Sequence, residues 1–150
     1  MILAKNIINQ YSNSNRAGVI LYDVSISKFI FGIDKKSGDI TDFGGGCKKT
    51  EDIISTAKRE LFEESGYFIN YNTLNECYSI NFNNVYIIFL PISSFELKKN
   101  EEIEDIIYVD NIDRNIINKM YIRIRKVFDN NKNILDQDLK NKITKHFYFL

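Results

Sequence analysis

Residues 45–67 read GGCKKTEDIISTAKRELFEESGY, and the rest of the chain is interpreted around them. The stretch joins a glycine-rich turn to an amphipathic helical pattern with acidic residues near its end. Thr50 is a candidate N-cap, followed by acidic residues in the first turn, where the helix dipole favours negative charge. Gly66 suits the position that ends a helix. The spacing therefore predicts a helix over residues 51–65, after three glycines (44–46) that allow a ligand to approach the main chain closely.

The predicted helix carries an apolar stripe and an acidic sector. The apolar residues recur at steps of three and four: Ile54, Ala57 and Leu61. Glu60, Glu63 and Glu64 stand at i, i+3 and i+4 and so share one sector of the helix surface. Carboxylates this close repel one another, and Arg59 is expected to pair with one of them. A hard divalent cation such as Mg²⁺ would balance the others, because it prefers oxygen ligands. The alternative is an acidic helix end that is simply solvated.

These residues resemble the signature of the Nudix hydrolases. The matching positions are Gly45-x5-Glu51-x7-Arg59-Glu60-Leu61-x-Glu63-Glu64-x-Gly66. The last position of the signature is usually a small aliphatic residue, and here it is Tyr67, whose ring can fill the same apolar role. The resemblance implies an α+β fold, a Nudix-type α/β/α sandwich with a mixed β-sheet between helices. At 150 residues the chain fits a single domain of this kind over residues 1–150.

The resemblance also implies an activity. Nudix hydrolases act on phosphorus-containing acid anhydrides, so this chain is expected to cleave a diphosphate linkage in a nucleoside diphosphate joined to another group. The implied cofactor is Mg²⁺, with Mn²⁺ as a substitute, and the implied metal ligands are Glu60, Glu63, Glu64 and the main-chain carbonyl of Gly45. One glutamate would be the general base. Arg59 would hold the carboxylates in position, and Glu51 would pair with Arg59 or bind the metal through water.

A second acidic cluster, at residues 101–105, reads EEIED. In the Nudix family a glutamate of the corresponding loop often supplies another metal ligand or the base. The candidates here are Glu101, Glu102 and Glu104, of which Glu102 is preferred, and the alternative is an acidic surface loop. Lysines also flank the expected site. Lys48 and Lys35 are candidates for binding substrate phosphates, and the alternative is that they are solvated loop lysines.

The signature determines the chemistry but not the substrate. A small nucleotide such as a nucleoside triphosphate, ADP-ribose or a dinucleotide is the default partner. The 5′ cap of RNA and diphosphoinositol polyphosphates are the larger alternatives. The alternative of another class is a catalytically silent nucleotide-binding module, but all acidic residues of the signature are present, which favours an enzyme. A homodimer is compatible with the resemblance, although no stretch marks a dimer surface.

Composition excludes several other classes of function. The formal net charge is zero, so no strong field draws the whole chain to nucleic acid or to a membrane. Cys47 and Cys77 are too few and too far apart for a disulfide framework or a zinc motif, and we expect free thiols. His146 is the only histidine, which leaves little for histidine-based triads or metal sites. No targeting signal or membrane-length apolar run is found, so a cytoplasmic protein is expected.

Apolar runs predict strands over residues 16–22, 27–33, 40–43, 74–80, 85–90 and 106–109. Residues 81–84 are typical of a hairpin turn. The strand over residues 85–90 follows this turn, and Pro91 is expected to mark its end. From Ile112 onward the pattern is helical, with one continuous apolar stripe: Ile116, Ile117, Met120, Ile124 and Val127. A last helical segment is expected over residues 135–145.

Overall fold

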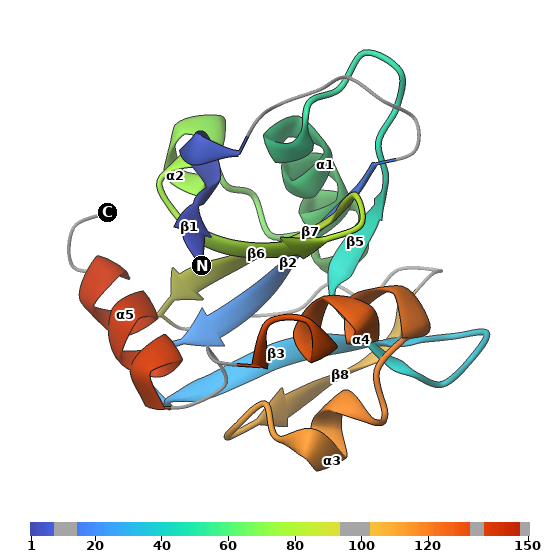
Figure 1. Cartoon of the computed structure of the whole chain (residues 1–150), viewed down its shortest axis with the longest axis vertical. Coiled ribbons are helices and arrows are strands. Elements are labelled where there is room, and N and C mark those ends of the chain that lie inside the picture. Colours follow the sequence, from blue (N-terminus) through green and yellow to red (C-terminus); the bar gives the residue numbers. More distant parts are fainter. Residues whose placement is uncertain (8–14, 94–102, 133–136, 148–150) are drawn as a thin grey trace.

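A mixed β-sheet runs through the middle of the molecule (Figure 1). The computed structural model describes residues 1–7, 15–93, 103–132 and 137–147. Its strands are β1 (Ile2–Leu3), β2 (Arg16–Asp23), β3 (Lys28–Asp34), β4 (Ile40–Thr41), β5 (Phe43–Gly46), β6 (Tyr78–Phe82), β7 (Val85–Ile92) and β8 (Ile103–Val109). They follow the order β1-β6-β7-β2-β3-β4, with β5 paired to β2 and β8 paired to β3. Within the described ranges, β2 and β7 run parallel and the other strand pairs are antiparallel.

Helices cover both faces of this sheet (Figure 1). One face carries α1 (Ile53–Ser65) and α2 (Tyr71–Asn75), with the short 3-10 helix η1 (Ala4–Asn6) beside them. The other face carries α3 (Arg114–Ile117), α4 (Ile122–Asp129) and α5 (Gln137–Phe147). The expected α+β architecture, a mixed sheet between helices, is confirmed.

The central strand β2 separates two hydrophobic clusters, because successive side chains of a strand point to opposite faces of the sheet. Ala17, Val19 and Leu21 pack in the cluster that contains α1. Ile20 and Tyr22 pack in the cluster that contains α4 and α5. All eight residues of β2 are buried, as its continuous apolar run predicted.

The sheet forks beside β2, and this fork creates the space for a site. Along one edge, β2 pairs with β3 over Leu21–Asp23 and with β5 over Arg16–Val19. The single expected strand at 40–43 is in fact two short strands, since β4 pairs with β3 and β5 pairs with β2. Asp42 lies between them, at the point where the chain crosses from one partner to the other.

The helix of the opening stretch begins two residues later than predicted. Asp52, not Thr50, is its N-cap, and the Asp52 side chain accepts a hydrogen bond of 2.7 Å from the main-chain N–H of Ser55. The hydroxyl of Tyr71 in α2 donates to the other carboxylate oxygen of Asp52, also at 2.7 Å, which links the start of α1 to α2. Gly66 ends the helix with φ 75°, the left-handed conformation that favours glycine, as predicted.

Two strand predictions after α1 are partly wrong. The segment expected to be extended from residue 74 begins with α2, because Asn70 caps a helical turn by accepting a hydrogen bond from the main-chain N–H of Thr73. Pro91 does not end its strand but lies inside β7. Since β6 pairs with β7 only as far as Phe89, the missing N–H of Pro91 breaks no hydrogen bond between these two strands. The hairpin turn is tighter than expected and consists of Asn83 and Asn84, both with positive φ.

The helix expected from residue 112 is interrupted. Between α3 and α4 the chain becomes extended and hydrogen-bonds to β4: Ile40 donates to the main-chain oxygen of Lys119 at 2.9 Å and accepts from Tyr121 at 2.8 Å. This sheet-like pairing satisfies main-chain groups that a continuous helix would satisfy internally. Its consequence is that Tyr121 and the start of α4 are held next to the fork.

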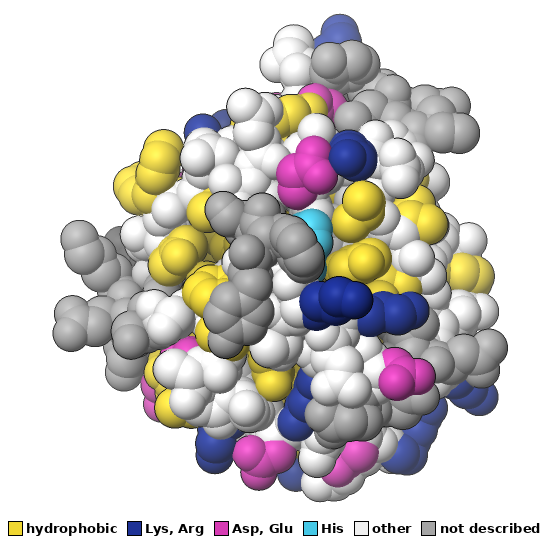
Figure 2. Space-filling model, turned by 90° about the vertical axis from the view of Figure 1, so that its left-hand side faces the viewer, with side chains coloured by type: hydrophobic (Ala, Val, Ile, Leu, Met, Phe, Trp, Pro, Cys, Tyr) yellow, Lys and Arg dark blue, Asp and Glu magenta, His cyan; other side chains and the backbone are white. Residues whose placement is uncertain are grey.

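Figure 2 views the molecule from the left-hand side of Figure 1, where α5 lies, and shows basic and acidic side chains among apolar ones. His146 packs there against Tyr78, with ring centroids 5.4 Å apart, which agrees with a packing role. Cys47 and Cys77 are buried free thiols, and burial raises the pKa of Cys77 to about 12. Among the described helices, none is both long and apolar enough to cross a membrane.

Candidate functional site

Arg59 connects three glutamates to the glycine strand. Its Nε and Nη2 donate to the two carboxylate oxygens of Glu51 at 2.8 and 2.9 Å. Its Nη1 donates to Glu60 at 2.9 Å and to Glu63 at 3.1 Å, and Nη2 also contacts the carbonyl oxygen of Gly46 at 3.2 Å. Arg59 thus pairs with the clustered glutamates, as expected, but with two of them rather than one, and with Glu51 as well.

Glu51 fastens the loop before α1 to the helix itself. Besides Arg59, its Oε1 accepts hydrogen bonds from the main-chain N–H of Lys48 at 3.0 Å and from the hydroxyl of Thr56 at 3.1 Å. The hydrogen bond from Arg59 is the main reason that the pKa of Glu51 falls to about 2. The pKa of Arg59 is raised in turn by the same bond. Of the two alternatives considered for Glu51, the structure contains the pairing with Arg59.

The three clustered glutamates differ in exposure. Glu60 and Glu64 are buried, at 8% and 3% exposure, whereas Glu63 is exposed. Glu60 lies directly against the main chain of Gly45: a Cβ at that position would come within 2.5 Å of a Glu60 carboxylate oxygen. Glycine is required there for close approach rather than for an unusual backbone angle, since positive φ among the described glycines occurs only at Gly38 and Gly66.

The oxygen-rich donor set of the glutamate cluster is of the kind that binds a divalent cation. In the described part of the chain no three acidic, histidine or cysteine side chains already converge as a metal site, and Arg59 occupies oxygens of Glu60 and Glu63. The chemistry of the set nevertheless fits such an ion. Three carboxylates, those of Glu51, Glu60 and Glu63, contact the one guanidinium of Arg59. Glu64, on the same sector of α1, is buried like Glu60, and such an excess of negative charge calls for a further cation.

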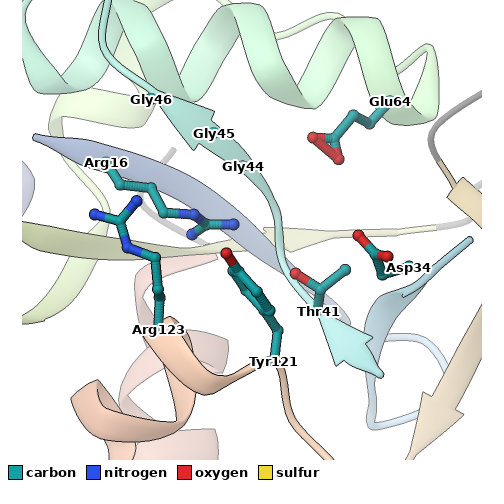
Figure 3. Close-up of a pocket in the computed structure, with 9 residues that line it drawn as sticks. All are labelled: Arg16, Asp34, Thr41, Gly44, Gly45, Gly46, Glu64, Tyr121 and Arg123. Atoms are coloured by element: carbon teal, nitrogen blue, oxygen red, sulfur yellow. The ribbon is translucent and has the colours of Figure 1, made fainter. Parts of the chain in front are cut away.

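A pocket of about 250 Å³ opens beside this cluster, at the fork of the sheet. Its lining residues come from both halves of the sandwich: Arg16, Asp34, Thr41, Gly44, Gly45, Gly46, Glu64, Tyr121 and Arg123. Figure 3 shows Glu64 and Asp34 on one side of the pocket and Arg16 and Arg123 on the other, with the glycine strand between α1 and Tyr121. The pocket therefore has an acidic side and a basic side.

Arg16 is held on the basic side by a buried ion pair. Its Nη1 and Nη2 donate to the two carboxylate oxygens of Asp42 at 2.9 and 2.7 Å, and its guanidinium carbon lies 5.6 Å from the ring centre of Tyr121. Burial alone would lower the pKa of Arg16, but the carboxylate of Asp42 outweighs it and the pKa is raised. The pair uses two of the five guanidinium N–H groups and leaves three for other contacts.

Two glycines make room for this ion pair. A Cβ at Gly18 would lie 2.0 Å from Oδ2 of Asp42 and 2.8 Å from the Cα of Gly44. A Cβ at Gly44 would lie 2.7 Å from the Cα of Gly18. The two glycines are also register partners in β2 and β5. A close approach of the two strands therefore encloses the carboxylate that orients Arg16.

The sequence patterns do not single out Arg16, Asp42 or Tyr121 as residues of a site. The apolar runs place Arg16 only at the start of one predicted strand and Asp42 within another. Tyr121 and Arg123 were placed within a continuous helix. A charged residue at each end of an otherwise apolar run was the available signal for Arg16, whereas the bridge to β4 that positions Tyr121 has no signature in the sequence.

The remaining predicted site residues are less closely connected. Lys48 contributes its main-chain N–H to Glu51, while the side chains of Lys48 and Lys35 are exposed and neither lines the pocket. Glu101 and Glu102 lie outside the described residues, and Glu104 is in β8. Their proposed roles stay predictions.

No family model matches the chain, and no curated protein matches it in sequence. Solved structures do resemble it. A MutT/nudix family protein from Enterococcus faecalis superposes with a TM-score of 0.52 at 14% identity, over 69% of this chain and 46% of that one. A bifunctional NMN adenylyltransferase/ADP ribose pyrophosphatase from Francisella tularensis, complexed with AMP and a manganese ion, gives 0.55 at 15% identity, over 81% and 42%.

An Ap4A hydrolase from C. elegans, in a binary complex, gives a TM-score of 0.55 at 14% identity, over 90% of this chain and 97% of that one. The chain thus spans less than half the length of the Enterococcus and Francisella proteins but almost the whole of the C. elegans protein. At such low identity these likenesses establish the architecture. The chain has the Nudix fold.

Proposed function

We propose that this protein is a divalent-metal-dependent hydrolase that cleaves a diphosphate linkage in a nucleoside diphosphate joined to another group. The observation that carries the proposal is the acidic cluster of α1 beside the main chain of Gly45, at one side of a pocket in a Nudix fold. Two carboxylates of this cluster, those of Glu60 and Glu64, are buried. Burying these charges without a cation to balance them would lower the stability of the fold.

The proposed metal ligands are Glu60, Glu63, Glu64 and the main-chain carbonyl of Gly45. A bound Mg²⁺ or Mn²⁺ would screen the diphosphate charge and lower the pKa of a coordinated water. Glu63 is the most accessible of the three carboxylates, and it shares a guanidinium nitrogen with Glu60. The general base is one of these glutamates or Glu102.

Arg59 and Glu51 act as positioning residues in this proposal. Arg59 holds Glu60 and Glu63 on the side of the glycine strand, and Glu51 fixes Arg59 through two hydrogen bonds. Because Glu51 is also bonded to Lys48 and Thr56, the loop before α1 and the carboxylates of α1 form one connected unit.

The pocket indicates the general chemistry of the substrate but does not select one compound. An acidic side and a basic side suit a ligand that carries phosphate groups and is bound together with a cation. Nucleoside triphosphates, ADP-ribose and dinucleoside polyphosphates belong to this class, as do the RNA cap and diphosphoinositol polyphosphates. The protein is proposed to act as one domain in the cytoplasm.

The test is a hydrolysis panel over these substrates with Mg²⁺ and with Mn²⁺, comparing the wild type with Glu63→Gln. The side chain of Glu63 is 51% exposed, so the substitution should leave the fold intact. We expect its rate to fall by about 10²- to 10⁴-fold, the range for loss of a group that acts on the reacting water. Glu76→Gln is the matched control, because it removes a similarly exposed carboxylate from the surface pair with Lys5.

Full activity in Glu63→Gln would contradict the assignment of this residue. Metal-dependent nucleotide binding without turnover of any substrate would instead favour the catalytically silent binding module. Calorimetric measurement of Mn²⁺ binding to the wild type and to Glu63→Gln shows whether a loss of activity arises only because the variant no longer binds the metal.

A further inference from the structure

The basic side of the pocket continues beyond the pocket itself. Arg123 lines it and also lines a second pocket of about 160 Å³, whose other residues are Phe82, Asn83, Val85 and Lys126. This second pocket lies between α4 and the turn that joins β6 to β7. A hydrogen bond of 3.2 Å from the Asn131 side chain to the carbonyl of Asn81 fastens the end of α4 to β6. The two pockets are thus adjacent, because they share Arg123 in their linings.

Arg123 and Lys126 bring positive charge to this surface, and no carboxylate of the described residues forms an ion pair with either. They stand at i and i+3 of α4 and therefore share one side of the helix. Within the described ranges, neither side chain forms an ion pair or a hydrogen bond. The first turn of α4 contains no acidic residue, so the positive end of the helix dipole adds to the field of Arg123.

Arg16 extends the same row of charges into the first pocket. Figure 3 shows its guanidinium group next to that of Arg123, extending into the pocket. Asp42 fixes the position of Arg16 but leaves three of its N–H groups for another acceptor. Arg123 and Lys126 carry like charges on one side of α4, and an anion that reaches them and the remaining N–H groups of Arg16 would reduce their repulsion. Arg16, Arg123 and Lys126 are called the basic strip below.

We propose that the basic strip binds a chain of phosphate groups that extends beyond the linkage being cleaved. The inference rests on the proposed function and narrows its substrate class to linear polyphosphates with three or more phosphate groups, such as nucleoside triphosphates and dinucleoside polyphosphates. A compact diphosphate held near Glu60 and Glu64 would not need Lys126. A longer chain would pass Arg16 and Arg123 and place its distal phosphates in the second pocket.

Phosphate fits the strip better than a carboxylate ligand does. Guanidinium groups form paired hydrogen bonds with phosphate oxygens, and each phosphate group of a chain brings its own negative charge. The acidic side of the pocket would repel an acidic peptide, whereas a polyphosphate can carry its own divalent cation to that side.

Calorimetric binding of inorganic tripolyphosphate to the whole protein, without metal and at fixed low salt, tests the proposal without requiring turnover. We expect Arg123→Gln and Lys126→Gln each to weaken binding by about tenfold, the effect of one charge-assisted hydrogen bond. Arg125→Gln is the matched control: it removes the same charge from the same helix, but its guanidinium donates to Asn118 at 3.4 Å instead of lining either pocket. Its effect should stay within about twofold, as expected of a screened distant charge.

A second arm compares substrates under turnover with Mg²⁺. Lys126→Gln should raise the KM for diadenosine tetraphosphate by about tenfold and that for ADP-ribose by less than twofold, with kcat nearly unchanged for both, because the residue contributes binding away from the cleaved bond.

The two arms separate failure of this inference from failure of the proposed function. If the wild type does not bind tripolyphosphate, or if Arg123→Gln and Lys126→Gln bind it as well as Arg125→Gln does, the basic strip is not a phosphate site, whatever the enzyme hydrolyses. If Arg123→Gln and Lys126→Gln lose tripolyphosphate binding while the wild type hydrolyses no substrate, the basic strip is a phosphate site and the hydrolase proposal is wrong. An equal rise in KM for ADP-ribose would overturn the preference for longer chains.

Discussion

Two arginines lie beside the glycine strand β5 and are held in opposite ways. Arg59 divides its guanidinium among Glu51, Glu60 and Glu63, and its side chain is 21% exposed. Arg16 forms one paired contact with Asp42, and the two side chains are 6% and 0% exposed. The first arrangement contains more negative than positive charge and can accept a cation. The second is neutral and closed, so it can orient a donor toward the pocket but has little freedom to rearrange.

The comparison predicts the largest loss of stability at Asp42. Asp42→Ala leaves the buried guanidinium of Arg16 without its partner, which should lower the free energy of unfolding by about 3 to 5 kcal/mol. Urea denaturation at neutral pH measures the change. The double variant with Arg16→Met should recover part of the loss, because it removes the unpaired charge. A double variant as unstable as the single one would show that the cost arises from packing and not from charge.

Gly18→Ala should come next, since it crowds the same ion pair without removing a charge. The added methyl group would meet Asp42 and the main chain of Gly44, neither of which can move freely. Overpacking of this kind costs about 1 to 3 kcal/mol. Gly46→Ala is the control, because no atom lies within 4 Å of a Cβ built there. The midpoint of thermal unfolding should be clearly lower for Gly18→Ala than for Gly46→Ala. Equal midpoints would mean that β2 and β5 have room for a methyl group at Gly18.

The pH dependence of stability tests the ion pair between Glu51 and Arg59. Glu51 has a pKa of about 2 in the folded protein, below its ordinary value of 4.5, so its contribution to stability is complete above pH 4.5 and is lost as the pH falls toward 2. For a partly screened pair we expect about 1 to 2 kcal/mol. The wild type should be more stable than Glu51→Gln by this amount at pH 6, and the difference should vanish near pH 2. A difference independent of pH would argue against the ion pair as its cause.

The smallest effect is expected at a pair on the surface. Arg114 and Asp129 are 2.7 Å apart, closer than several contacts of Arg59, but their side chains are 51% and 36% exposed. Asp129→Asn should change the free energy of unfolding by less than about 1 kcal/mol. Denaturation in parallel with Asp42→Ala gives the contrast directly. A large loss at Asp129 would mean that distance, rather than burial, ranks the ion pairs of this protein.

Much of the fold was accessible from the sequence because its signals were local. The end of α1 at Gly66 followed from the backbone freedom of glycine, and the buried strand β2 followed from an uninterrupted apolar run. The interruption between α3 and α4 could not be predicted from the stripe of residues 116–127, because the competing hydrogen bonds come from Ile40, about eighty positions earlier in the chain. Pro91 was misplaced for a similar reason, since only the length of β6 shows that its missing N–H is harmless.

The acidic cluster was determined by sequence alone, because residues three and four apart on a helix must be neighbours whatever surrounds them. The same rule placed Arg59 beside Glu63. The basic side of the pocket depended on tertiary structure. Arg16 meets Asp42 only because β2 and β5 pair in the register that sets Gly18 opposite Gly44, and Arg123 faces the pocket only because the chain before α4 adds to β4. Helix periodicity fixes neighbours along one element, whereas strand register and the joining of distant segments are settled only when the whole core packs.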